Sequence, residues 1–91
     1  MRKITEYIVG AFLNRQEACR DNTYTDGHAL FLFNKKIAEW RDGKIWITDA
    51  GWDTATTKER LNGIPGVSVW HHKHQLYLND KPWDGSWTCV P

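Results

Sequence analysis

The sequence has little that would mark a secreted or membrane protein. Its 91 residues include only two cysteines, Cys19 and Cys89, which are too few for the disulfide framework of a small secreted domain. No apolar run approaches the roughly 18 residues of a membrane span, and the N-terminus does not resemble a signal peptide. We therefore expect both cysteines to be reduced, semi-buried thiols in a cytoplasmic protein that does not associate with membranes.

The sequence also lacks an excess of charge of either sign. It has 12 basic and 11 acidic side chains, a net charge of +1 and an isoelectric point near 7.8. A nucleic-acid mimic would be strongly acidic, and a protein that binds duplex DNA by bulk charge has an isoelectric point above about 9. Both classes are excluded.

Aromatic residues are abundant, with six Trp, three Tyr and three Phe in a chain long enough for one domain over residues 1–91. A core of this size does not need six indoles, so we expect some of them to lie at the surface. Trp46 and Trp52 are expected in the core. The other four tryptophans lie near strand ends or turns, where we expect a ring to be half covered. They are Trp40, Trp70, Trp83 and Trp87.

The apolar pattern predicts an α+β fold. Helical spacing of Ile4, Ile8 and Phe12 predicts an N-terminal helix over 4–13, which ends at Asn14 or continues through 16–19. Gly10 within it suggests close packing on a sheet. The order α-β-β-β-α-β-β predicts one antiparallel sheet of about five strands. The strand-like segments of this order are 29–33, 36–40, 44–48, 67–70 and 75–78, with a loop at 71–74. The segment 23–25 leads into a hairpin turn, and 87–90 can add a final edge strand.

A short central helix is predicted by the segment TTKERLNGIPG. Thr56 and Glu59 have the spacing of a capping box, in which each side chain bonds the other residue's backbone N–H. Asn62-Gly63 then ends the helix after barely two turns.

Four segments follow one another along the chain: LFLFNKKIAEW, ITDAGW, TTKERLNGIPGVSV and LYLNDKPWDG. Together they resemble small accessory proteins of tailed bacteriophages, a group without an established activity. The sequence departs from the group's pattern at Phe33, where histidine is common, and in the histidine-rich segment 71–74. The resemblance implies an accessory phage gene, of the kind that often encodes inhibitors of host or defence proteins, and hence a location in the cytoplasm of the bacterial host.

No catalytic or cofactor motif is present. His71, His72 and His74 have spacing that a metal site could use, but we interpret them as a solvated loop and expect no metal. Neither cysteine lies in a catalytic context, and the carboxylate pairs lie in turn sequences, where Asp caps backbone amides. We therefore expect no enzymatic activity and no cofactor.

The leading hypothesis is a protein-interaction module, because partly exposed Trp is enriched at interface hot spots. Its expected partner is a bacterial host or anti-phage defence factor, which the module would block sterically, in the manner of an anti-CRISPR protein. The residues expected to bind this partner are Trp70, His72, Tyr77, Trp83 and Trp87, with Lys58 and Arg60 as a polar flank.

Two alternatives remain open. A single-stranded DNA or RNA binder would use the helix start at Thr57, Lys58 and Arg60, with an exposed Trp52 to stack on a base. A homodimer would form through the edge strand predicted at 87–90.

Overall fold

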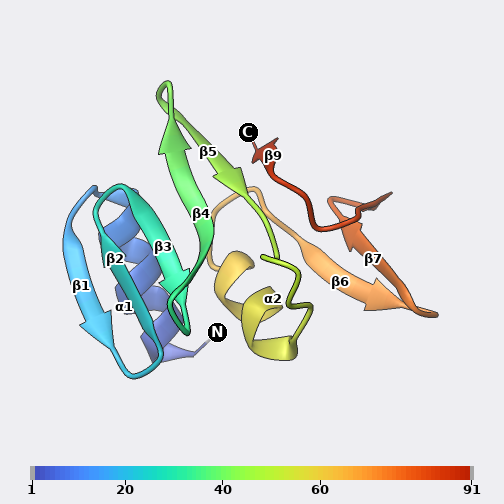
Figure 1. Cartoon of the computed structure of the whole chain (residues 1–91), viewed down its shortest axis with the longest axis horizontal. Coiled ribbons are helices and arrows are strands. Elements are labelled where there is room, and N and C mark those ends of the chain that lie inside the picture. The colour runs from blue at the N-terminus through green and yellow to red at the C-terminus, as the bar shows by residue number, and fades with distance from the viewer. Residues whose placement is uncertain (1, 91) are drawn as a thin grey trace.

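The computed structural model describes residues 2–90, which form two helices and two antiparallel sheets (Figure 1). The helices are α1 (Lys3–Leu13) and α2 (Ala55–Leu61). The first sheet has the order β1-β2-β3-β4-β5-β9, formed by Glu17–Arg20, Thr23–Asp26, Ala29–Leu32, Lys35–Arg41, Lys44–Ile47 and Thr88–Val90. The second has the order β6-β7-β8, formed by Val69–His72, Gln75–Leu78 and Lys81–Pro82.

The predicted α+β class is confirmed, but the number and grouping of strands differ from the prediction. Two sheets replace the single one, because the chain builds β6 to β8 as a separate unit before β9 returns to pair with β5. The segment at 16–19 is not a helical extension. Arg15 adopts a φ of 57°, which reverses the chain, and Glu17–Arg20 then pairs with β2.

Helix α1 covers one face of β1, β2 and β3 (Figure 1). Its buried side is formed by Thr5, Ile8, Val9 and Phe12. Gly10 is not a point of close approach to the sheet, because a Cβ built there has no atom within 4 Å.

Replacing Gly10 with alanine is therefore expected to stabilise the protein by about 0.5–1 kcal/mol, since alanine loses less backbone entropy in a helix interior. Urea denaturation followed by circular dichroism measures the change. Gly63→Ala is the matched control with the opposite sign, because its Cβ would lie 2.6 Å from Thr5 Cγ2. A loss of stability in Gly10→Ala would contradict the open position of this residue.

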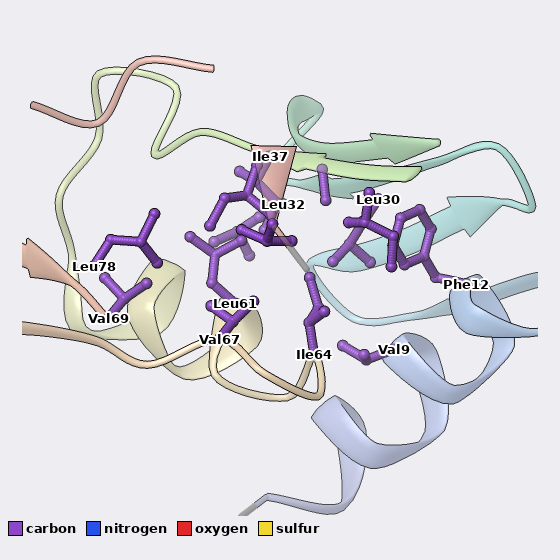
Figure 2. Close-up of a cluster of buried hydrophobic side chains, with 14 of the residues drawn as sticks. Val9, Phe12, Leu30, Leu32, Ile37, Leu61, Ile64, Val67, Val69 and Leu78 are labelled. Carbon is purple, nitrogen blue, oxygen red and sulfur yellow. The ribbon is translucent and has the colours of Figure 1, made fainter. Parts of the chain in front are cut away.

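One hydrophobic core connects all the layers, and α2 contacts both β4 and β6. Figure 2 shows apolar side chains from α1, the first sheet, α2 and the second sheet directed toward a common interior. Those labelled there are Val9, Phe12, Leu30, Leu32, Ile37, Leu61, Ile64, Val67, Val69 and Leu78.

The start of α2 differs from the predicted capping box. The cap is Thr54, whose Oγ1 accepts the backbone N–H of Thr57 at 3.1 Å. Thr56 already lies inside the helix, which begins at Ala55, and Glu59 instead accepts hydrogen bonds from the Thr5 hydroxyl and the Arg60 guanidinium.

Arg60 is completely buried, so the prediction that it forms part of an exposed polar flank of the partner-binding site is wrong. Its Nε donates to Thr23 Oγ1 and its Nη1 donates to Thr5 Oγ1, both at 2.9 Å. The guanidinium thereby joins α2 to β2 and α1, and its charge is paired with Glu59 Oε1 at 3.1 Å. A buried cation is tolerated only with such partners.

Two asparagines fix the second sheet to α2 and to the loop before β6. Asn62 Nδ2 donates to the Val69 carbonyl at 3.0 Å, and its Oδ1 accepts the Val69 N–H at 2.6 Å. Asn79 Oδ1 accepts the Ser68 N–H, and Asn79 Nδ2 donates to the Gly66 carbonyl. Asn62 belongs to the segment TTKERLNGIPGVSV and Asn79 to LYLNDKPWDG, so these two segments help to hold the fold together.

Candidate interaction surface

The second sheet has one face in the core and one face toward solvent. Val69, Leu76 and Leu78 are buried, and the residues that alternate with them point outward. We call this outward side the aromatic face; it consists of Trp70, His72, Gln75, Tyr77 and Pro82.

An apolar row runs across the three strands of the aromatic face. Trp70 lies opposite Tyr77, with ring centroids 4.4 Å apart and ring planes 13° from parallel. Pro82 of β8 lies opposite Tyr77 on the same face of the sheet, so Tyr77 is half-buried between Trp70 and Pro82. Trp70, at the edge of the row, remains 37% exposed, and His72 lies 6.3 Å from it. The stacked pair therefore presents a preorganised indole to a partner.

The turn that ends the β6–β7 hairpin is formed by Lys73 and His74, with φ values of 49° and 68°. Two-residue hairpin turns favour glycine or asparagine at such angles, because a side chain there is strained. A lysine and a histidine occupy this strained turn, next to the pair His72 and Gln75, so Lys73 places a positive charge at this end of the aromatic face.

Trp83 does not belong to the exposed set, contrary to the prediction. It is 7% exposed, and its Nε1–H is directed to Thr88 Oγ1 at 2.9 Å and to the Ser86 carbonyl at 3.1 Å. The ring therefore packs in the core and anchors the chain between the two sheets.

The remaining predicted residues lie elsewhere. Trp87 is half-buried on the first sheet, with the Arg41 guanidinium 4.7 Å from its ring centroid. Lys58 Nζ contacts Asp53 at 3.1 Å, and Asp53 also contacts His71 Nε2 at 2.8 Å, on the opposite side of β6 from the aromatic face. The structure thus brings together Trp70, His72 and Tyr77.

The family model of the Kyanoviridae Gp96 protein matches residues 1–89. The chain belongs to this family. It is therefore a bacteriophage protein of the tailed-phage type, which confirms the origin implied by the sequence resemblance. No curated protein and no solved structure matches the chain. In residues 2–90 of this Gp96 family member, no helix is long and apolar enough to cross a membrane.

In this Gp96 family member, two of the three residues proposed for the nucleic-acid helix start are buried. They are Thr57, whose N–H donates to Thr54 Oγ1, and Arg60. Lys58 is partly exposed and is paired with Asp53.

Trp52, expected in the core, is instead 40% exposed. It stacks with Phe33 at a centroid distance of 5.5 Å, and Lys35 Nζ lies 4.9 Å from its ring centroid. Trp46, also expected in the core, is half-buried on the solvent side of the first sheet.

The histidines and cysteines of this Gp96 family member are dispersed. His71 and His72 belong to β6 rather than to a loop, and as neighbours in a strand they point to opposite faces. Cys19 and Cys89 are exposed rather than semi-buried, on the two edge strands of the first sheet. Among residues 2–90, no group of three or more His, Cys, Asp or Glu side chains is arranged for a metal ion.

Sequence reasoning missed Gln75 and Pro82 on the aromatic face. Gln75 has the same strand parity as Tyr77, so the period-two pattern could have placed it there. Pro82 belongs to a two-residue strand whose pairing depends on the fold.

Proposed function

We propose that this member of the Gp96 family is a non-enzymatic accessory protein that binds a protein partner through the aromatic face. The observation that supports this proposal is the exposed Trp70 ring stacked on Tyr77. Large, rigid aromatic side chains dominate interface energies because they bury much apolar area and lose little conformational freedom. The side-chain hydrogen bonds of Asn62 and Asn79 hold the underlying sheet in place.

The proposed partner is a bacterial host or anti-phage defence protein in the host cytoplasm, which the phage protein inhibits by steric occlusion. The phage origin of the family supports this class of partner. The shape of the site also supports it, because a flat row of side chains fits the surface of a macromolecule better than it encloses a small substrate.

The test is purification of the tagged protein from bacteria infected by the phage. Trp70→Ala and Tyr77→Ala are each expected to weaken partner binding roughly 30-fold, the effect of losing about 2 kcal/mol at a hot spot. Tyr7→Ala is the matched control, because Tyr7 is 49% exposed on α1, which packs on β1, β2 and β3 of the first sheet. Binding is measured by isothermal titration once the captured protein is purified.

The site assignment is rejected if both variants keep their fold and bind the partner as the wild type does. A photo-crosslinking amino acid at position 75 gives an independent readout, since Gln75 lies on the same face and is exposed. Adducts from position 7 but not from position 75 would place the partner on α1.

The nucleic-acid alternative now depends on the exposed pair Phe33 and Trp52 with Lys35 beside it. The same purification distinguishes a nucleic-acid ligand from a protein partner. A captured ligand that nuclease removes, and whose capture is lost in Trp52→Ala but not in Trp70→Ala, would favour a single-stranded nucleic acid.

A further inference from the structure

The two sheets have four edge strands, and three of them carry features that prevent pairing with another chain. Strand β1 carries the charges of Glu17 and Arg20. At β6, the Asn62 side chain occupies the backbone groups of Val69. Strand β8 is two residues long and contains Pro82, which has no N–H. Strand β9 is also short, but its sequence, Thr-Cys-Val, contains no charged residue and no proline.

The hydrogen-bonding groups at the open edge of β9 belong to Cys89. The β4–β5 hairpin has a two-residue turn, so Arg41 and Lys44 form a hydrogen-bonded pair and the pattern alternates from there. Following this alternation, Cys89 lies opposite Trp46 in a non-hydrogen-bonded pair. Its backbone N–H and C=O therefore point away from β5, toward the open edge.

A mainly apolar recess of about 540 Å³ opens beside the same edge. It is lined by Trp40, Gly43, Lys44, Ile45, Cys89 and Val90. A strand that paired with β9 would cover part of this recess and remove apolar surface from water, which favours association.

We propose that β9 pairs antiparallel with β9 of a second copy of this chain, about a two-fold axis at Cys89. In this arrangement each Cys89 N–H donates to the Cys89 carbonyl of the other copy, and the first sheets of both copies become continuous. Two-fold pairing places a residue opposite itself, so a charge at the centre would repel its own copy. The Thr-Cys-Val sequence is uncharged along its whole length, whereas Glu17 and Arg20 place charges at both ends of β1.

A proline at position 89 tests the pairing without breaking the sheet of the monomer. Because the Cys89 N–H points away from β5, Cys89→Pro removes only the outward donor. Sedimentation equilibrium over a range of concentrations is expected to show a dimer for the wild type and for Cys89→Ser. For Cys89→Pro, the dissociation constant is expected to rise at least tenfold. A wild type that stays monomeric, or equal dimerisation of Cys89→Pro, would overturn the proposal.

Thiol crosslinking gives a second test that does not depend on the folding of the proline variant. A short bismaleimide is expected to link two copies through Cys89, so Cys19→Ser keeps the crosslinked dimer and Cys89→Ser loses it. Both thiols are exposed, which makes them matched probes of the two edges. Linkage of Cys19 to Cys89 would indicate head-to-tail pairing and reject the two-fold dimer. The aromatic face lies on the other sheet, so failure here leaves the proposed function standing.

Discussion

Replacing Arg60 with leucine is expected to lower the free energy of unfolding by about 2–4 kcal/mol, as removal of one member of a buried ion pair does. The substitution removes the donors to Thr5 and Thr23 and leaves the Glu59 carboxylate without its cation. The loss falls short of the largest known cases, because the Glu59 side chain stays 26% exposed and water can solvate it. Burial lowers the pKa of Arg60, but an arginine starts so far above neutrality that it stays charged.

Urea denaturation at neutral pH measures this effect, with Lys58→Ala as the control. Lys58 lies two residues earlier on α2, but it makes only a partly exposed ion pair with Asp53, worth about 0–1 kcal/mol. If Arg60→Leu costs no more than Lys58→Ala, the buried network does not hold α1, β2 and α2 together.

Gly85→Ala is expected to destabilise the protein by about 2–4 kcal/mol, from left-handed backbone strain and from steric overlap. Gly85 has a φ of 84°, and a Cβ there would overlap the Asp49 carboxylate. The contact is fixed on both sides, because the Gly85 carbonyl accepts the Asp49 N–H at 3.1 Å and the Thr48 hydroxyl. The substitution would therefore separate the end of β5 from the chain that leads into β9.

Gly43→Ala separates the two causes. Gly43 has a similar φ of 77° but no atom within 4 Å of a built Cβ, so only the strain of about 1–2 kcal/mol applies. Thermal unfolding of both variants gives the difference. Equal losses would mean that Asp49 moves aside and that its contact with Gly85 contributes little.

Local pattern predicted the local structure. The spacing of Ile8 and Phe12 identified α1, and alternation with turn residues identified the hairpins. The grouping of strands into two sheets depended on contacts between distant residues, such as Thr48 with Gly85 and Ile45 with Val90, which no local pattern encodes. The capping box was wrong because Thr54 and Thr56 are both acceptable caps and the packing of Glu59 selects between them.

The candidate site was only partly predictable for the same reason. Trp70 was predicted at the site because it lies near a strand end, where a ring is half covered. Its stacking on Tyr77 was not predictable, because it depends on the two-residue turn Lys73–His74 that replaces the loop predicted at 71–74. Exposure of single residues was not predictable, since Arg60 and Trp83 are buried by elements far away in the sequence. A charged residue on a short helix usually faces water, and only the hydroxyls of Thr5 and Thr23 make the buried position of Arg60 stable.

The position of β9 affects how the protein folds during translation. Ile47 pairs with Thr88, so the edge of β5 stays unpaired until residues 88–90 have been translated. Closing such a long loop is slow, because its entropy is lost before the distant pairing compensates for it. Until this pairing forms, the open edges of β5 on two nascent chains can pair with each other, so rapid pairing of β9 with β5 would limit aggregation.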